Sequence, residues 1–277
     1  MISQAERAEQ LRALHHAPQP LVLVNAWDAV SARIIESCGF PAIATTSAGI
    51  ANLEGFSDGA YLDRNSMLAG VARVVRAVNV PVTADMENGY GPTVGDAIAT
   101  AHGVIDAGAV GLNFEDSVSD GREPLIDTQA QAERIRAIRK VAQERGVPLV
   151  INARTDMYLK KVGDSGARLG ATLQRTRAYV AAGADCIFVP LVADAATIRE
   201  LVLHAGAPLN ILVREESLPI GELARLGVRR MSLGGWPHGH TMLALRRFAE
   251  GVRDHPEDAI AAERTPLIDL NALFDRY

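Results

Sequence analysis

Pro81-Val-Thr-Ala-Asp85-Met-Glu87-Asn-Gly-Tyr-Gly91 joins an apolar segment to a polar turn bracketed by glycines. Residues 80–84 predict a buried strand. Alternate residues of a strand point to the same side, so Asp85 and Glu87 face one point if the strand continues that far. Two converging acids repel each other unless a proton or a cation lies between them, and hard oxygen ligands suit Mg²⁺ or Mn²⁺. A solvated turn with two surface acids is the alternative interpretation.

A short apolar segment followed by a helix recurs eight times along the chain. The segments lack the polar alternation of half-exposed strands, which indicates parallel strands covered by helices. Glycine repeatedly separates a helix from the next strand, where it can adopt the left-handed conformation that ends a helix. We therefore predict strands at 21–24, 41–47, 80–85, 109–114, 147–152, 185–190, 209–213 and 228–233. We predict helices at 3–16, 28–38, 62–78, 93–107, 128–145, 168–182, 194–204, 219–226 and 239–253, and a glycine-containing loop at 49–59.

Eight such units in roughly 250 residues predict an α/β fold, the (β/α)8 TIM barrel. Residues 1–277 are then a single barrel domain, with an N-terminal helix in 1–20 and a C-terminal helical segment at 238–277. The alternative is an open doubly wound sheet. That fold needs fewer strands and usually has a glycine-rich phosphate turn after the first strand, which Ala26-Trp-Asp-Ala lacks.

Composition excludes several classes of protein. The net charge is −5 without a run of Lys or Arg, so we expect no nucleic-acid partner. No apolar run approaches ~18 residues and the N-terminus is polar, so we expect neither a membrane span nor a signal peptide. The two cysteines, Cys38 and Cys186, form no CxxC motif and are read as core thiols. These features predict a soluble cytoplasmic protein.

Polar side chains gather where the predicted strands end. Barrels place their active sites at these ends, and buried acids cost several kcal/mol unless they are paired, so the pattern favours function over stability. Three acids invite a divalent metal, an arginine offers a planar fork for a carboxylate or phosphonate, and hydroxyls suit an anionic substrate end. The set comprises Trp27, Asp28, Thr45, Thr46, Ser47, Asp85, Glu87, Glu115, Asp116, Arg154, Asp156, Asn210, Arg214 and Ser232.

Seven ordered blocks between about residues 20 and 235 resemble the isocitrate lyase/phosphoenolpyruvate mutase superfamily. The Asp-x-acid-x-Gly-Tyr-Gly block is the most specific, although Glu87 replaces the commoner Asp. The blocks are Asn25-Ala-Trp-Asp-Ala-Val-Ser-Ala-Arg, Thr45-Thr-Ser-Ala-Gly-Ile-Ala, Gly55-Phe-Ser-Asp-Gly59, Asp85-Met-Glu-Asn-Gly-Tyr-Gly91, Gly111-Leu-Asn-Phe-Glu-Asp116, Asn152-Ala-Arg-Thr-Asp156 and Ala182-Gly-Ala-Asp-Cys-Ile-Phe-Val-Pro190.

The resemblance implies a barrel enzyme that uses Mg²⁺, or Mn²⁺ instead, to form or cleave a C–C or P–C bond next to a small 2-oxo acid through an enolate. By analogy, Asp85 binds the metal directly, while Glu87 and Glu115 bind it directly or through water. The resemblance also implies a homo-oligomer, a dimer or tetramer, in which the last helix is exchanged between subunits.

The same analogy assigns the residues that contact the substrate, a 2-oxo acid or dicarboxylate. Asp58, on the loop after the second strand, approaches the reacting group, and Arg154 binds the substrate anion; these two are the expected catalytic residues. Arg154 together with Arg214 would suit a dicarboxylate. The expected substrate-binding residues are Trp27, Thr46, Ser47, Ala48, Asp85, Arg154 and Asn210.

One loop departs from the superfamily pattern. The lyase branches carry a Lys-Cys-Gly-His loop whose Cys acts in acid–base catalysis, but the matching segment here, 117–126, has no Cys, His or Lys. Cleavage of isocitrate or methylisocitrate is therefore not expected, and the phosphonopyruvate and oxaloacetate decarboxylase-like branches fit better. Two alternatives stay open. One is a barrel that binds metal and 2-oxo acid without turnover, and the other is an enzyme that binds a phosphorylated substrate at Gly234-Gly235.

Overall fold

The computed structural model describes residues 2–59, 62–118, 124–257 and 268–274. All strand pairs in its sheet are parallel. The first strand is interrupted at Val24, so that β1 (Leu21–Leu23) pairs with β9 (Arg230–Ser232) and β2 (Asn25–Ala26) pairs with β3 (Ile43–Thr45). Because β1 and β2 are consecutive, the sheet returns on itself as a nearly closed barrel. The other strands are β4 (Val82–Asp85), β5 (Gly111–Glu115), β6 (Val150–Arg154), β7 (Cys186–Phe188) and β8 (Leu209–Leu212).

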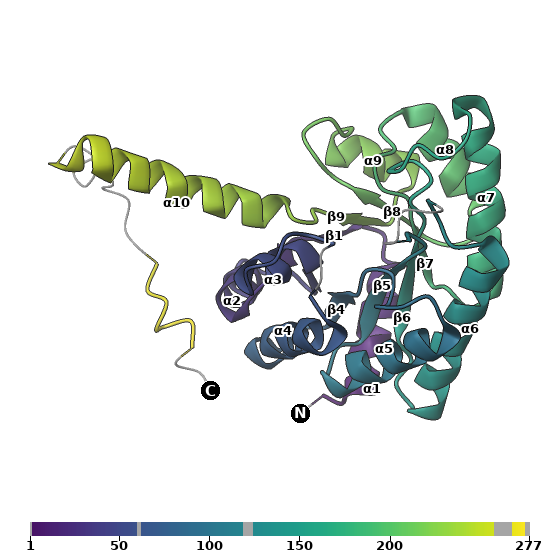
Figure 1. The fold of residues 1–277 in the computed structure, drawn as a ribbon, viewed down its shortest axis with the longest axis horizontal. Helices are drawn as coiled ribbons and strands as arrows, with labels where there is room; N and C mark the ends of the chain where they lie inside the picture. The colour runs from purple at the N-terminus through teal and green to yellow at the C-terminus, as the bar shows by residue number, and fades with distance from the viewer. Residues whose placement is uncertain (1, 60–61, 119–123, 258–267, 275–277) are drawn as a thin grey trace.

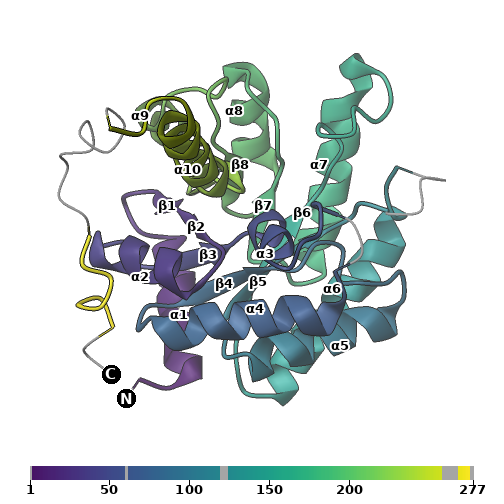
Figure 2. The same cartoon turned by 60° about the vertical axis from the view of Figure 1, so that its left-hand side comes forward.

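Helices surround this sheet (Figures 1 and 2). The helices that pack on the barrel present apolar side chains to the strands; in α4, for example, Met67, Val71 and Val74 are fully buried. The prediction of a (β/α)8 barrel is confirmed. The helices are α1 (Gln4–Leu14), α2 (Ala29–Ser37), α3 (Ser47–Leu53), α4 (Arg64–Ala77), α5 (Val94–Asp106), α6 (Thr128–Glu144), α7 (Ser165–Ala181), α8 (Ala195–His204), α9 (Ile220–Leu226) and α10 (Trp236–Asp254).

Two local predictions are wrong. The loop expected at 49–59 begins as helix α3, and its Gly49 marks close packing rather than a turn. A Cβ on Gly49 would lie 2.6 Å from the Cβ of Trp27, so only glycine lets α3 approach the end of β2. Cys38 is exposed at the end of α2 and is not a core thiol, whereas Cys186 is buried in β7.

Helix α1 closes the N-terminal end of the barrel. The Gln4 side-chain amide donates to the carbonyls of Ile105 and Ala109 at 2.9 and 3.0 Å, and Arg12 donates to the carbonyl of Pro148 at 2.9 Å. The carbonyls of Ala109 and Pro148 lie just before β5 and β6, and that of Ile105 lies in the last turn of α5. A ligand therefore has access to the barrel interior from the opposite end, where the strands finish.

Helix α10 projects from the barrel as a separate arm (Figure 1). Of its side chains only His238 is buried. The short segment 268–274 returns to α2, where the Arg33 guanidinium donates to the carbonyl of Leu273 at 2.8 Å. Residues 258–267 and 275–277 of the predicted C-terminal segment lie outside the described residues. Within the described part of the chain, no helix is both long and apolar enough to cross a membrane.

Candidate active site

The C-terminal ends of the strands enclose a cavity of about 210 Å³. Pockets for drug-sized ligands measure ~300–1,000 Å³, so this one suits a smaller molecule. Polar side chains from all around the barrel line it. They are Asn25, Thr45, Thr46, Ser47, Asp58, Thr83, Asp85, Asn113, Asn152, Arg154, Asn210, Arg214, Arg230 and Ser232, with Ala48, Gly234 and Gly235 among the smaller neighbours.

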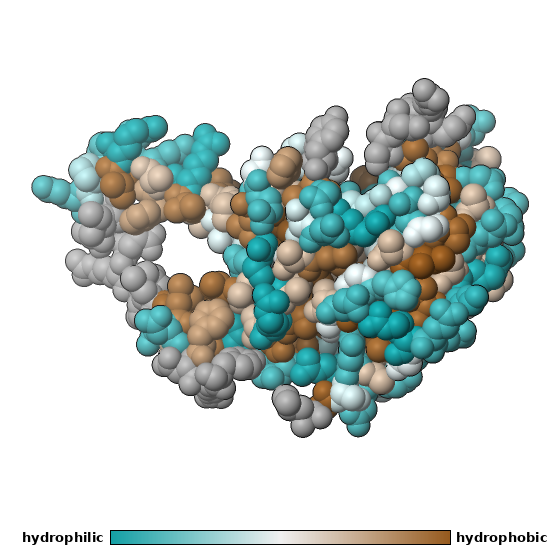
Figure 3. Space-filling view, turned by 60° about the horizontal axis from the view of Figure 1, so that its bottom comes forward, coloured by the Kyte–Doolittle hydropathy of each residue, from teal (hydrophilic) through white to brown (hydrophobic). Residues whose placement is uncertain are grey.

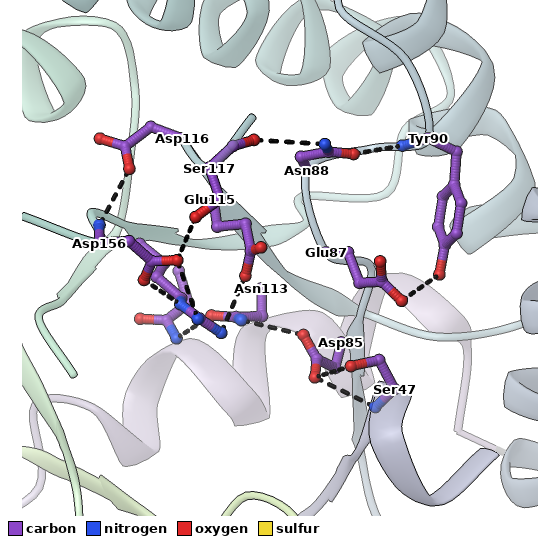
Figure 4. Close-up of polar contacts among 12 residues, drawn as sticks. Ser47, Asp85, Glu87, Asn88, Tyr90, Asn113, Glu115, Asp116, Ser117 and Asp156 are labelled. Atoms are coloured by element: carbon purple, nitrogen blue, oxygen red, sulfur yellow. Dashed lines mark hydrogen bonds and ion pairs between the residues drawn. The ribbon is translucent and has the colours of Figure 1, made fainter. Parts of the chain in front are cut away.

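Asp85, at the end of β4, is held in place by three donors (Figure 4). One carboxylate oxygen accepts from the Ser47 N–H at 3.1 Å and from the Ser47 hydroxyl at 2.8 Å, and the other accepts from the Asn113 amide at 3.0 Å. Asn113 in turn accepts from Asn152 at 2.9 Å. This chain of hydrogen bonds from α3 across β4, β5 and β6 fixes the carboxylate at the cavity wall.

Arg154, at the end of β6, shares the cavity with Asp85. Its Nε and Nη2 donate to both oxygens of Asp156 at 2.6 and 3.0 Å, and its Nη1 lies 2.8 Å from a Glu115 oxygen. The guanidinium has five N–H donors, and Asp156 uses two of them. Glu115 and a substrate carboxylate can share the rest. The two carboxylates raise the pKa of Arg154 above its usual value against the opposing effect of burial, so this group stays cationic.

A buried network positions the carboxylate that holds Arg154. The Asp156 backbone N–H donates to Asp116 at 2.9 Å, and the Ser117 hydroxyl donates to the Asp156 side chain. Asp116 accepts from the Tyr179 hydroxyl at 2.7 Å and from Arg175 at 3.2 Å. Asp156, which orients Arg154, is therefore itself held by hydrogen bonds to its side chain and its backbone, and this preorganises the guanidinium.

Glu87 lies elsewhere than strand alternation predicts. Strand β4 ends at Asp85, and Glu87 adopts φ +48°, so its side chain does not share the direction of Asp85. It faces the Tyr90 hydroxyl at 3.4 Å instead (Figure 4). Burial, with the negative charges of Asp85 and Asp58 adding to it, raises the pKa of Glu87 to about 7. The condition for the two acids to converge, a strand reaching Glu87, is not met.

The Asn-Gly-Tyr turn requires glycine at position 89. The φ of Gly89 is +85°, in the region that favours glycine, and an added Cβ would lie 2.5 Å from the Phe114 ring. Glu87 and Tyr90 also adopt left-handed φ, and such conformations of non-glycine residues concentrate at functional sites. This turn is therefore held in a conformation that few other sequences allow.

The expected site residues divide into two groups. Thr46, Ser47, Ala48, Asp58, Asp85, Arg154 and Asn210 line the cavity, while Trp27, Glu87 and Glu115 are not among its lining residues. Trp27 packs edge-on against the ring of His238, with centroids 4.9 Å apart, so the structure gives it a packing contact rather than a place at the cavity. Glu115 faces Arg154.

The donor set fits a metal ion that takes few protein ligands. In the described part of the chain, no three His, Cys, Asp or Glu side chains form a group that could hold an ion together, so the expected three-acid cluster is not assembled. Mg²⁺ usually keeps several waters and needs only one or two carboxylates. Asp85 lines the cavity and can supply one. Burial raises the pKa values of Asp58 and Glu87, and the negative charge of Asp85 raises them further, an excess of charge that a cation would relieve.

Five polar cavity residues were missed at the sequence level: Asn25, Thr83, Asn113, Asn152 and Arg230. Asn113, Asn152 and Arg230 interrupt strands that are otherwise apolar, and each occupies an inward position. The sequence signal for these three residues was the presence of polar side chains within apolar segments. The segments are Gly-Leu-Asn-Phe, Val-Ile-Asn-Ala and Val-Arg-Arg-Met. Alternation within a strand that is buried on both faces does not say which side faces the barrel axis.

The backbone just after β9, at Leu233 and Gly234, is hydrogen-bonded to Asn25. The Asn25 side-chain oxygen accepts from the backbone N–H groups of Leu233 and Gly234 at 3.0 and 2.8 Å. Two donors that a phosphate would use there are thus already engaged. Of the loop 117–126, residues 119–123 lie outside the described residues; Lys160 donates to the carbonyl of Val118 at 3.2 Å.

Comparison with known proteins gives consistent matches. The family model described as phosphoenolpyruvate phosphomutase matches residues 11–253. An uncharacterized protein of Mycobacterium tuberculosis is 37% identical over 242 residues, which cover 87% of this chain and 88% of the relative.

Two solved structures extend the comparison. A protein of Burkholderia cenocepacia, provisionally described as a phosphonomutase, is 40% identical with a TM-score of 0.84 over 90% of this chain and 99% of its own. A 2,3-dimethylmalate lyase, described as a PEP mutase/isocitrate lyase superfamily member, is 28% identical with a TM-score of 0.81 over 97% of this chain and 93% of its own.

Proposed function

Since this chain belongs to the phosphoenolpyruvate mutase/isocitrate lyase superfamily, whose members include lyases and mutases, we propose that it forms or cleaves a C–C or P–C bond next to a small 2-oxo acid with the help of a divalent metal. The observation that carries this proposal is the convergence of Asp85 and Arg154 on one cavity of about 210 Å³. A fixed acid and a fixed guanidinium suit a metal-assisted reaction of a small carboxylate.

Arg154 binds the substrate carboxylate in this proposal. Its side chain lines the cavity and is oriented by Asp156, so the N–H groups that Asp156 and Glu115 do not use are available to a substrate oxygen. Asn210 lines the same cavity and offers an amide to the neighbouring substrate oxygen. The side of the cavity where negative charge develops on the ketone oxygen is lined by the start of α3, with Thr46, Ser47 and Ala48.

Mg²⁺, or Mn²⁺ in its place, is the proposed cofactor, with Asp85 as its direct ligand. Breaking a bond beside a ketone leaves an electron pair that is delocalised onto the ketone oxygen, and a bound dication supplies positive charge there. Ser47 and Asn113 keep the Asp85 carboxylate aimed at the cavity through hydrogen bonds at 2.8 and 3.0 Å.

Asp58 is the proposed group for proton transfer, in place of the cysteine that segment 117–126 lacks. It lines the cavity, and partial burial together with the charge of Asp85 raises the pKa of its carboxyl. A raised carboxyl pKa brings an acid closer to neutral pH, where it can both donate and accept a proton. This feature favours an enzyme over the alternative, a barrel that binds metal and 2-oxo acid without turnover.

A substrate panel tests the proposal. Oxaloacetate, phosphonopyruvate and a 2-methylmalate-type acid are incubated with the protein and Mg²⁺, and 2-oxo acid products are measured by mass spectrometry. We expect conversion of at least one substrate, abolished by EDTA and restored by Mg²⁺ or Mn²⁺. Tight, metal-dependent binding in calorimetry without conversion of any substrate would favour the binding protein instead.

We also propose a homo-oligomer in which α10 packs on a second copy of the chain. The arm exposes Trp236, Met242, Leu243, Leu245 and Phe248, with Leu245 60% exposed. Figure 3 shows apolar side chains along one side of the arm and hydrophilic ones along the other. An amphipathic helix of this kind is stable in water when another surface covers its apolar side.

The oligomer can be tested with one substitution on the apolar side of α10. Phe248→Glu places a charge among the apolar side chains and is expected to yield monomers in light scattering coupled to size exclusion. Arg247→Glu alters charge at the neighbouring exposed position and is the matched control. A wild-type protein that elutes as a monomer at micromolar concentration would refute the proposal.

A further inference from the structure

Arg230 lies at the floor of the cavity and is only 2% exposed. It begins β9, where it pairs with Leu21 at the start of β1, and its Nη1 lies 3.4 Å from the His15 ring just after α1. Helix α1 closes this end of the barrel. The guanidinium therefore sits beneath the polar ring of the cavity, away from the mouth where Arg214 is exposed.

No carboxylate pairs with Arg230 in the described part of the chain, and its buried Nε has no hydrogen-bond partner. The other two buried arginines of the described residues have oxygen acceptors. Arg33 pairs with Glu36, and Arg134, whose Nε also has no partner, donates to the carbonyls of Asn88 and Gly91. Burial lowers the pKa of Arg230, and its neighbour Cys186, whose pKa burial raises to about 12, carries no negative charge at neutral pH. A buried, unpaired cation is costly, so its retention calls for a counter-ion.

The surroundings of Arg230 contain further polar groups without partners. The buried Thr83 hydroxyl and the Asn152 side-chain oxygen line the same cavity and have no hydrogen-bond partner. Asn210, which pairs in register with Arg230, bonds at 3.3 Å to Ser232, two residues beyond Arg230 on β9. The Thr83 hydroxyl and the Arg230 guanidinium can donate hydrogen bonds to an anion. The Asn210 amide and the Ser232 hydroxyl can also reorient and donate to that anion.

We propose that Arg230, with the Thr83 hydroxyl and the Asn210–Ser232 pair, forms a second anion subsite at the floor of the cavity, which takes a carboxylate or a small inorganic anion. The anion can come from solution or be the second carboxylate of a dicarboxylic substrate. The substrate source rests on the proposed function, whereas binding of a free anion does not. If the substrate supplies the anion, Arg154 and Arg230, rather than Arg154 and Arg214, are the two cations that select a dianion.

Thermal unfolding of the metal-free protein in EDTA tests the subsite without turnover. Sodium formate is compared with sodium gluconate at equal ionic strength, because gluconate is too large for the floor of the cavity. Formate at about ten times its dissociation constant is expected to raise the Tm of the wild type by about 3 °C. Arg230→Met should lose this formate effect, and its Tm in gluconate should equal or exceed that of the wild type because an unpaired buried cation is gone.

Two further variants separate binding from folding. Arg230→Lys keeps the charge and is expected to retain part of the formate effect even if Arg230→Met folds poorly. Arg225→Met removes an exposed arginine of α9 and should leave the formate effect intact. Equal responses to formate and gluconate in the wild type, or a formate effect that persists in Arg230→Met, would overturn the subsite.

Calorimetry on the Mg²⁺-loaded protein distinguishes the two sources of the anion. If the substrate supplies it, Arg230→Met weakens binding of a dicarboxylate such as oxaloacetate about 10-fold or more, leaves pyruvate binding unchanged, and formate competes with the dicarboxylate. If the anion is free, formate strengthens or leaves unchanged the binding of both acids. A protein that converts no substrate but shows the formate effect would fail the proposed function while keeping the subsite.

Discussion

Asp85→Ala is expected to lower kcat/KM by at least about 10²- to 10³-fold while leaving the Tm unchanged or higher. Removing one group that stabilises developing charge in an active site typically costs this factor. Here the same substitution also removes the direct metal ligand of the proposed site. Stability is expected to survive because the charge of Asp85 adds to the effect of burial in raising the pKa values of Asp58 and Glu87, so this charge disfavours the folded protein without metal.

Three measurements check this expectation. Product formation is followed on the best substrate of the panel, Mn²⁺ binding by electron paramagnetic resonance, and Tm by scanning calorimetry. Glu54→Ala is the control, since Glu54 is an exposed acid paired with Arg73 at 2.8 Å on the surface. An Asp85→Ala enzyme with wild-type activity would remove Asp85 from the proposed chemistry. Loss of activity together with a large fall in Tm would show a structural role instead.

Arg134→Met is expected to destabilise the protein by about 2–4 kcal/mol. Arg134 is 1% exposed in α6, and its guanidinium donates to the carbonyls of Asn88 and Gly91 and to the Gln131 side chain at 2.7 Å. It also lies 4.7 Å from the centre of the Phe114 ring. Each buried carbonyl left without a donor costs about 1–3 kcal/mol, and loss of the buried cation offsets part of the sum.

Because Arg134 holds both ends of the turn 88–91, activity is expected to fall along with stability. Urea unfolding measures the free energy change, and Arg136→Met, at an exposed position of the same helix, is the control. Arg134→Lys keeps one cation but not the planar fork, and is expected to recover part of the loss. Unchanged stability in Arg134→Met would mean that the turn does not depend on the hydrogen bonds from Arg134. The contrast with Arg230 is instructive, because a buried arginine stabilises only where it has acceptors.

Much of the fold follows from local chemistry that is visible in the chain. Apolar segments without alternation specify buried parallel strands, and glycines such as Gly108 and Gly183, both with left-handed φ, end the helices before them. The regular order of eight such units leaves the barrel as the architecture that pairs every strand. Helix α3 was missed because Gly49 reads locally as a loop residue, whereas packing against Trp27 decides its role.

The site was predicted in part. A strand end carrying Asp85 or Arg154 is recognisable because polar residues follow an apolar run, and both residues do line the cavity. The direction of Glu87 could not be predicted, because it depends on where β4 stops and on the left-handed turn held by Arg134 from a distant helix. The inward positions of Asn113 and Arg230 depend on the register between strands, which no single strand contains.

The sequence by itself determines the alternation of strands and helices and the concentration of charge at one set of strand ends. Its physical basis is short-range: hydrophobic burial, backbone freedom at glycine and the periodicity of each element. Only the tertiary structure decides that Asp85 is bound by Ser47 and Asn113, that Glu115 pairs with Arg154, and that no carboxylate of the described residues pairs with the buried Arg230. Those contacts join residues from separate strands, and closure of the barrel alone sets the distances between them.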